Sequence, residues 1–433
     1  MTTVVRAELP ATRRAVIERV RALRPELAVD GPGIDADGAD PTRNMALLGA
    51  AGLHRLNVPT EFGGLWDGGP YGGWREFMET IVEVSAADGS TGQCWATTGL
   101  VAREIYASEL AGETKRLLAG EIMHEGRRFV ASNAETGGAG RVLGQRVAGG
   151  LVVSGTKTFN TNSGGGGRDL ACVSFALLDG DAAVGDGVAD RVAAAPRHHA
   201  LIRLDDPALA LAHDWDNMGQ RGTCSQTITY RDVFVPDGWH FAAKPVDPYF
   251  LCAAMLLHGA LLQGIGEGAL AAAVGYLREL NRPSMPKFGT AAADPLMHRQ
   301  LGEMSSELAA ARALLLSVSA ELASTTAGLE SVVEGLVVPA AGVESPAGGV
   351  SADEMGVRGF RAKIASTRAG LDVSARIHDL TGARSTANRY RFDRFWRNAR
   401  TFGSHDSIDA KNALVGAYEL AGALPPIADY FRV

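Results

Sequence analysis

The pattern of hydrophobic and polar positions divides the chain into three zones. Between about residues 5 and 125, apolar residues recur at three- and four-residue spacing, which predicts amphipathic helices. We expect four of them, over Ala11–Leu23, Pro41–Leu53, Tyr71–Ala87 and Thr91–Ser108. From about residue 128 to 240, short β-branched runs divided by Gly, Asn and Asp predict strands of an antiparallel barrel or sandwich.

The third zone, from about residue 248 to 425, is helical again. Its strongest signal is a heptad-like seam that predicts a long bundle helix. The seam consists of Met297, Leu301, Met304, Leu308, Ala311, Leu315, Val318 and Leu322. Further helices are expected over Arg361–Leu380, ending before Gly382, and over Ser407–Leu424. His258 and other polar residues interrupt the apolar stretch Phe250–Leu277, so we expect a buried helix rather than a membrane span.

These zones predict a mostly α protein with a central β domain. We expect an N-terminal helical domain over 1–126, a middle β domain over 127–241, and a C-terminal helical bundle over 242–433. The Gly-, Pro-, Ala- and Val-rich stretch 324–356 is predicted to be a flexible insertion, and Asp179–Pro196 a surface loop. A GxGxxG motif between a strand and a helix is missing from the sequence, which argues against a nucleotide-binding doubly wound sheet.

Composition narrows the choice of partners. Charged residues make up 21% of the chain, and its net charge of −7 argues against nucleic acid as the main partner. The N-terminus has no apolar signal region, so we expect a cytoplasmic protein that does not associate with membranes. The four cysteines lie far apart, and the neighbours His198 and His199 have poor ligand geometry. We therefore expect reduced thiols and no metal site.

Five short segments suggest chemistry. They are Val58–Gly64 (VPTEFGG), Ser132–Gly137 (SNAETG), Gly155–Asn162 (GTKTFNTN), Met218–Ser225 (MGQRGTCS) with Arg231–Pro236 (RDVFVP), and Arg397–Arg400 (RNAR). In this order they resemble motifs of the acyl-CoA dehydrogenase superfamily over nearly the whole chain. The resemblance implies an N-terminal α domain, a middle β-barrel or sandwich, a C-terminal four-helix bundle and a homotetramer.

The segment Trp396–Asp406 (WRNARTFGSHD) indicates the branch of the superfamily. It resembles flavin-dependent monooxygenases related to dibenzothiophene and alkyl-sulfone oxygenases, which often have proline where this chain has Ser407. The resemblance implies the oxygenase component of a two-component system, supplied with reduced FMN or FAD by a separate NAD(P)H:flavin reductase. With O2 as co-substrate, it would hydroxylate a small molecule through a C4a-hydroperoxyflavin.

The same resemblance implies four catalytic candidates: His405, Asp406, Thr161 and Ser163. A histidine titrates near neutrality and suits acid–base work at a substrate hydroxyl, amine or thiol. The Thr161 hydroxyl is expected near flavin N5. Asp406 could orient His405, although adjacent side chains on a helix point apart. Ser163 and the run Gly164–Gly167 after it depart from the family text, and the glycines suit either a close backbone approach or a mobile lid.

The cofactor-binding candidates implied by the resemblance are Ser132, Asn133, Phe159, Thr161, Arg221, Ser225, Arg397 and Phe402. Phe159 is expected beside the flavin ring, and Arg221 at the flavin phosphate, which a guanidinium binds in a bidentate fork. Structural roles remain open: Phe159 as a strand core residue, Thr161 as a turn residue and Arg221 as a surface charge.

Two other functions stay open at this point. The first is an acyl-CoA dehydrogenase with tightly bound FAD, in which Asp406 takes the place of the usual glutamate base. The second is a non-enzymatic descendant of the fold. Within the monooxygenase hypothesis, Phe159, Trp396 and Phe402 suit an aromatic or polyketide-like substrate of secondary metabolism, and an amine substrate is also open. The same side chains could equally be bundle core.

Overall fold

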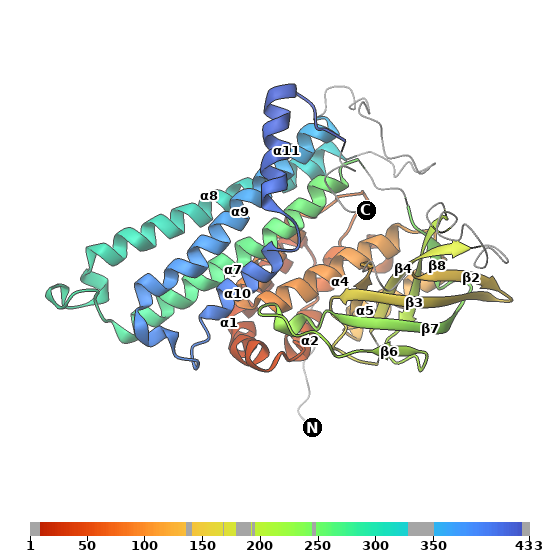
Figure 1. Ribbon diagram of the computed structural model, residues 1–433, viewed down its shortest axis with the longest axis horizontal. Helices are drawn as coiled ribbons and strands as arrows, with labels where there is room; N and C mark the ends of the chain where they lie inside the picture. Colours follow the sequence, from red (N-terminus) through yellow and green to blue (C-terminus); the bar gives the residue numbers. More distant parts are fainter. Residues whose placement is uncertain are drawn as a thin grey trace.

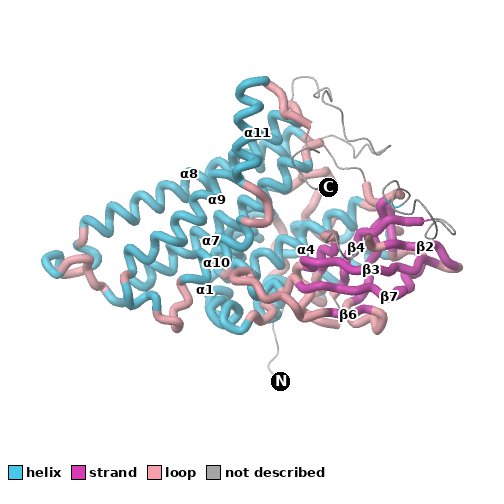
Figure 2. The backbone as a smooth tube through the Cα atoms, viewed as in Figure 1, coloured by secondary structure: helices cyan, strands magenta, loops and turns pink. Residues whose placement is uncertain are grey.

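The computed structural model describes residues 9–135, 141–167, 169–178, 192, 195–244, 248–327 and 350–426. A bundle of long helices forms one end of the molecule and a β-sheet forms the other (Figures 1 and 2). The predicted fold class, mostly α with a central β domain, is confirmed.

The N-terminal part consists of helices that pack between the bundle and the sheet. Their bounds are α1 (Arg13–Asp37), α2 (Thr42–Ala50), α3 (Trp74–Ala87), α4 (Gly89–Ala107) and α5 (Gly112–His124). Helix α3 packs on α7 (Phe250–Leu280), and α4 contacts strand β1 (Phe129–Ser132). Asp88 caps the N-terminus of α4, since its carboxylate accepts a hydrogen bond from the Thr91 backbone N–H.

Helix α1 corrects the sequence prediction. The expected helix ended at Leu23, but α1 continues to Asp37 and ends at Gly38, whose φ is 61°. Val20, Leu27 and Ile34, spaced by seven residues, are all buried along it. A proline inside a helix costs about 3 kcal/mol, whereas each buried aliphatic side chain contributes about 1.5–3 kcal/mol. Burial of Leu27 and Ile34 beyond Pro25 therefore offsets much of the cost of the two internal prolines.

The β domain is one eight-stranded sheet with strand order β6-β7-β3-β2-β4-β5-β8, and β1 pairs with β4. After β1 the strands are β2 (Leu143–Val147), β3 (Gly150–Asn160), β4 (Leu170–Leu178), β5 (Arg197–Arg203), β6 (Leu209–Leu211), β7 (Gln226–Pro236) and β8 (His240–Ala242). The expected purely antiparallel arrangement is wrong, because β4 pairs in parallel with both β1 and β2. Period-two patterning does not distinguish parallel from antiparallel neighbours.

The bundle is built on α7, α8 (Pro295–Thr325) and α9 (Ala352–Thr381), with α10 (Asp393–Gly403) and α11 (Ile408–Ala421) packed on them (Figure 1). The heptad seam is confirmed, because all of its residues on α8 are buried except Leu301, which is half-buried. At Gly264 of α7, an added Cβ would lie 2.4 Å from the Val82 carbonyl oxygen. Glycine at this position therefore allows the close approach of α3 and α7.

Two described helices, α7 and α8, are long and apolar enough to cross a membrane by length and composition alone. The most apolar window of α7 is 72% buried, which supports the prediction of a buried bundle helix. The corresponding window of α8 is only 33% buried. Most of the predicted insertion 324–356 lies outside the described residues, and its two ends belong to α8 and α9. Most of the predicted loop Asp179–Pro196 also lies outside them.

Candidate active site

The end of strand β3 presents an aromatic ring to solvent. The pairing of β3 with β7 shifts register between Lys157 and Asn160. Within this irregularity Phe159 has a φ of 55° and is 58% exposed, and its ring meets Trp215 edge-on at 6.0 Å. A bulky residue in the left-handed region is strained, and such strain gathers at functional sites. Phe159 is therefore not a strand core residue, and its ring is open to a ligand.

Hydroxyl groups gather directly after Phe159. Thr161 Oγ1 lies 2.9 Å from Ser225 Oγ and accepts a 3.3 Å hydrogen bond from Gln93 Nε2 of α4. Ser225 Oγ in turn lies 2.8 Å from Thr223 Oγ1. The buried Ser163 hydroxyl donates to the Cys224 carbonyl at 2.7 Å. Thr161 and Ser225 thus form one polar group beside Phe159, whereas the hydroxyl hydrogen of Ser163 is used on the backbone.

Ser132 and Asn133 have different surroundings. The buried Ser132 hydroxyl donates to Asn160 Oδ1 at 2.5 Å and lies 2.8 Å from the Tyr230 hydroxyl. Asn133 is exposed, and its carbonyl accepts a 3.2 Å hydrogen bond from Lys157 Nζ. Ser132 therefore fixes the end of β3 from within the sheet, and Asn133 leaves its side chain on the surface.

A second group of rings lies on the bundle. The Phe402 and His405 rings are stacked, with centroids 5.8 Å apart and planes 11° apart. The His258 ring of α7 meets both edge-on, at 5.4 Å from Phe402 and 4.9 Å from His405. Phe402 is buried and His258 half-buried, but His405 as a whole remains solvent-exposed. The two imidazoles share one edge of the bundle, with His405 facing outward.

Two buried lysines hold the residue next to His405. Lys363 Nζ of α9 lies 2.6 Å from Asp406 Oδ2, and Lys411 Nζ of α11 bonds the other carboxylate oxygen. Although burial opposes the charged form of Asp406, the two lysines keep its pKa below the usual range. Lys363 Nζ also lies 3.4 Å from His258 Nδ1.

The same surroundings favour neutral imidazoles. Contact with the bundle, followed by the positive charge of Lys363, lowers the pKa of His405. Burial and Lys363 lower the pKa of His258 even further. At neutral pH His405 is therefore an uncharged, partly exposed base.

One loop connects the two groups. Along Met218–Ser225, the Met218 carbonyl accepts a 2.7 Å hydrogen bond from Arg397 Nη1, and the Gln220 N–H donates to Asn398 Oδ1 at 2.7 Å. Both of these partners lie on α10, the helix that carries Phe402. At its other end the loop supplies Ser225 to Thr161. The segment Met218–Ser225 thus links the hydroxyl group of Thr161, after β3, to helix α10, which precedes His405.

The two candidate arginines meet at the end of α1. Arg397 forms a bidentate ion pair with the buried Asp35, with N···O distances of 2.8 and 2.5 Å. Arg221 Nε donates to the Asp35 carbonyl at 2.7 Å, and its side chain is 30% exposed. Arg397 is held by a buried carboxylate, whereas the Nη1 group of Arg221 has only looser partners, the Asn217 carbonyl at 3.4 Å and the exposed Asp216 carboxylate at 3.8 Å.

Several residues at the site were not singled out from the sequence. His258, Lys363, Lys411 and Gln93 are brought to it from α7, α9, α11 and α4. Polar residues within apolar helical stretches could have pointed to them in the sequence. His258 interrupts such a stretch, and a lysine that is buried on a helix needs a carboxylate partner. Except for Lys411, which lies five residues after its partner Asp406, the partner of each residue depends on tertiary packing, which the sequence pattern does not state.

Known proteins with similar sequences support the family that the order of the motifs indicates. The chain is 30% identical over 434 residues to dibenzothiophene monooxygenase of Rhodococcus qingshengii, covering 96% of this chain and 94% of the relative. The chain belongs to this family of flavin-dependent monooxygenases. Residues 256–410, from α7 into α11, also match the family model "Acyl-CoA dehydrogenase, C-terminal domain". The monooxygenase prediction is confirmed.

Solved structures share the fold of this monooxygenase. The FMN-bound dibenzothiophene monooxygenase TdsC of Paenibacillus sp. A11-2 superposes with a TM-score of 0.76 at 23% identity, covering 96% of this chain and all of that one. Methanesulfinate monooxygenase MsuC of Pseudomonas fluorescens gives a TM-score of 0.75 at 24% identity, covering 95% and 98%. At this identity the likeness concerns the fold alone.

The dehydrogenase alternative does not fit Asp406. A base that removes an α-proton needs a carboxylate oxygen free to accept it. Both oxygens of Asp406 are bonded to buried ammonium groups, and its pKa is lowered rather than raised. Asp406 is therefore an anchor for the segment that carries His405. The relatives described above are monooxygenases, so the non-enzymatic alternative is not favoured either.

Proposed function

We propose that this chain receives reduced FMN from a separate NAD(P)H:flavin reductase and uses O2 to oxygenate a small aromatic molecule. The observation that carries the proposal is the exposed Phe159 ring beside the Thr161–Ser225 hydroxyl pair, tied by one loop to the helix before His405. Two relatives support the cofactor and the substrate class. SfnC of Pseudomonas putida, 28% identical over 53% of this chain, is a probable FMNH2-dependent monooxygenase, and TdsC has been solved with FMN and indole.

The residues present fit a flavin. An isoalloxazine ring needs an apolar surface and a few fixed hydrogen-bonding groups. Phe159 and Trp215 supply an aromatic surface, and Thr161 and Ser225 supply hydroxyls of fixed position. The partly exposed Arg221 is a donor for a phosphate. When bound, reduced flavin supplies the two electrons with which one oxygen atom of O2 enters the substrate and the other becomes water.

His405 is the proposed acid–base residue of the site. Its lowered pKa keeps the imidazole neutral at pH 7, so a ring nitrogen is able to accept a proton from the substrate. The stacked Phe402 ring and the edge-on His258 ring restrict its orientation. Asp406, fixed by Lys363 and Lys411, holds the backbone at this point. We assign His405 to proton transfer and Asp406 to positioning.

The proposed active form is a homotetramer in which other copies cover part of the bundle. Helix α8 is apolar, yet Ala309, Ala313, Leu314 and Ala320 are exposed on it. Such a face is typical of a helix that packs against another subunit. The molar mass measured by light scattering during gel filtration tests this assembly against the 45.4 kDa of one chain.

We place the enzyme in the cytoplasm, where NAD(P)H supplies the reductase and thiols stay reduced. Its four cysteines, Cys94, Cys172, Cys224 and Cys252, are all free. The natural substrate is proposed only by class, as an aromatic or heteroaromatic molecule. Indole serves as the probe because it is the ligand of the related TdsC structure.

The decisive experiment couples the purified chain to an FMN reductase with NADH and indole. We expect oxygenated indole to account for a large share of the NADH consumed, and more of it with FMN than with FAD. Oxidation of an acyl-CoA that is supplied in a parallel reaction, without oxygenation of any aromatic probe, would contradict the proposal. So would hydrogen peroxide as the only oxygen product across a panel of aromatic probes.

A further inference from the structure

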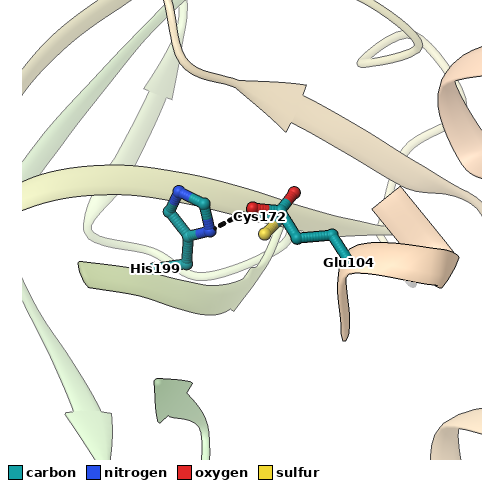
Figure 3. Close-up of side chains that lie close together, drawn as sticks. All are labelled: Glu104, Cys172 and His199. Atoms are coloured by element: carbon teal, nitrogen blue, oxygen red, sulfur yellow. Dashed lines mark ion pairs between the residues drawn. The ribbon is translucent and has the colours of Figure 1, made fainter. Parts of the chain in front are cut away.

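Three side chains with different ligand atoms converge where α4 covers the sheet. Glu104 comes from α4, Cys172 from β4 and His199 from β5, and their ligand atoms all lie within 4.8 Å of one another (Figure 3). The residues are far apart in sequence, which explains why cysteine and histidine spacing predicts no metal site.

The sheet register places two of these side chains together. In the β4–β5 pair Cys172 faces Leu201 and Ser174 faces His199, so Cys172 and His199 are diagonal neighbours on one face. Helix α4 lies over this face, with Val101 and Ile105 in the same apolar cluster as Cys172 and Phe241. The pairing of β4 with β5 and the packing of α4 therefore determine the positions of Cys172, His199 and Glu104.

The contact between His199 and Glu104 is not an ordinary hydrogen bond. Nδ1 of His199 lies 2.6 Å from Glu104 Oε1, but within the described residues this nitrogen has no hydrogen-bond partner of suitable geometry. His199 is only 8% exposed, and its ring meets Phe241 edge-on at 5.3 Å, which limits its rotation. A buried ring nitrogen without a hydrogen-bond partner of suitable geometry is available to a third group such as a metal ion. Figure 3 shows the Cys172 sulfur beside that carboxylate.

We propose that Glu104, Cys172 and His199 bind one Zn²⁺ ion, with water as the fourth ligand. A thiolate, an imidazole and a carboxylate together suit zinc, whereas Mg²⁺ and Ca²⁺ prefer oxygen ligands alone. In tetrahedral zinc sites ligand atoms lie about 3.5 Å apart, so Glu104 must draw back from His199 by about 1 Å. Glu104 has a side-chain exposure of 36%, which gives it room to move and lets the ion and water enter.

Without a cation, Cys172 stays a neutral thiol. Burial, with a smaller contribution from the charge of Glu104, raises its pKa well above the usual range. A metal ion would displace the thiol proton, so binding should release protons and weaken at low pH. Metal–ligand bonds would then join α4 to β4 and β5 in place of the contact between Glu104 and His199.

The proposed zinc site is separate from the flavin site. Gln93, which reaches Thr161, lies eleven residues before Glu104 on α4, about 16 Å along the helix axis. The expected effect of zinc is therefore on stability rather than on turnover.

Cobalt titration of the full chain, stripped with a chelator and kept reduced, tests the site directly. We expect one equivalent of Co²⁺ to bind with a thiolate-to-metal charge-transfer band and intense tetrahedral bands, both removed by Zn²⁺. Cys172→Ser should abolish the charge-transfer band, whereas the matched variant Cys252→Ser, a buried cysteine on α7, should keep it. Absence of the band in the unmodified chain, or its survival in Cys172→Ser, would overturn the proposal.

A second variant covers the case in which Cys172→Ser does not fold. Glu104 is partly exposed, so Glu104→Gln should fold while weakening cobalt binding at least about tenfold. Zinc should also raise the Tm of the unmodified chain clearly more than that of Glu104→Gln. Equal cobalt affinity and equal zinc-dependent Tm in the two proteins would contradict a site at these residues.

Discussion

The Lys363 ammonium lies 2.6 Å from one carboxylate oxygen of Asp406, on the residue that follows His405. Lys411 holds the other oxygen, so α9 and α11 clamp the turn between α10 and α11. The clamp gives His405 a fixed backbone and a nearby positive charge.

Lys363→Met should move the acidic limb of the pH–rate profile. Lys363 lowers the pKa of His405, so the substitution should raise that pKa. Because turnover requires the neutral imidazole, activity should then be lost at a higher pH than in the unmodified enzyme. Because Asp406 keeps Lys411, we expect a loss of about 2 kcal/mol in the free energy of unfolding. The control is Arg361→Met, an exposed cation on the same helix. An unmoved acidic limb would remove Lys363 from the tuning of His405.

His405→Ala should lower oxygenation about 10²-fold or more, the range for a positioned acid–base group. Because His405 is exposed and its side chain contacts the Phe402 and His258 rings without a hydrogen bond to another described residue, reduced FMN binding and Tm should change little. The comparison is His298→Ala, an exposed histidine on α8. Steady-state turnover and FMN titration measure both effects, and equal turnover in the two variants would rule out a chemical role for His405.

Phe159→Ala should weaken FMN binding without weakening the fold. The ring is 58% exposed, so its loss removes little buried surface, whereas an aromatic contact with the flavin contributes about 0.5–1.5 kcal/mol. We therefore expect a Kd for FMN raised about three- to tenfold. Phe234→Ala removes a phenyl ring of similar exposure, 51%, from the neighbouring strand β7 and should leave the Kd unchanged. If both variants bind FMN like the unmodified chain, the flavin does not lie against Phe159.

His54 should make the fold sensitive to acid. It is buried without a hydrogen-bond partner for either ring nitrogen within the described residues, and burial lowers its pKa to about 4. Between about pH 6.5 and pH 4, His54 is therefore protonated in the unfolded chain but neutral in the folded chain. The free energy of unfolding should fall across this range as the pH drops, by about 3 kcal/mol in all.

His54→Leu should flatten this part of the stability curve, as measured by urea unfolding at pH 7 and pH 4.5. His124→Leu changes an exposed histidine at the end of α5 and should leave the slope as it is. The difference between the two variants isolates His54 from the other groups that titrate in acid. Parallel curves for the two variants would mean that His54 does not control acid stability.

Long-range periodicity made most of the fold predictable. The seam from Met297 to Leu322 repeats over about four heptads, and the structure buries it as one side of α8. Strong helix stops were also predictable, as at Gly382, whose φ of 68° ends α9. The course of α1 through Pro25 and Pro32 was not, because the packing of Val20, Leu27 and Ile34 overrides local breakers. Parallel pairing of β1 with β4 depends on chain connectivity, which period-two patterning does not encode.

The site was predictable only where its residues lie in one segment. His405 and Asp406 follow a recognisable motif, and Phe159 and Thr161 lie in another. The roles of Lys363 and His258 arise from contacts between helices about 40 to 150 residues apart in sequence, whereas Lys411 follows its partner Asp406 by only five residues. The same limit applies to Glu104, Cys172 and His199, since only the packing of α4 on the sheet brings them together. Residue types at such positions are visible in the sequence, but their neighbours are not.

Transfer of one oxygen atom from O2 to an aromatic substrate is the central claim, and a single-turnover reaction under ¹⁸O2 tests it most directly. The chain is mixed anaerobically with one equivalent of reduced FMN and with indole, then exposed to labelled oxygen, and the product is analysed by mass spectrometry. We predict a product carrying one ¹⁸O atom, with His405→Ala giving mainly labelled hydrogen peroxide instead. Unlabelled product, or peroxide alone from the unmodified chain with indole and related aromatic probes, would contradict the account.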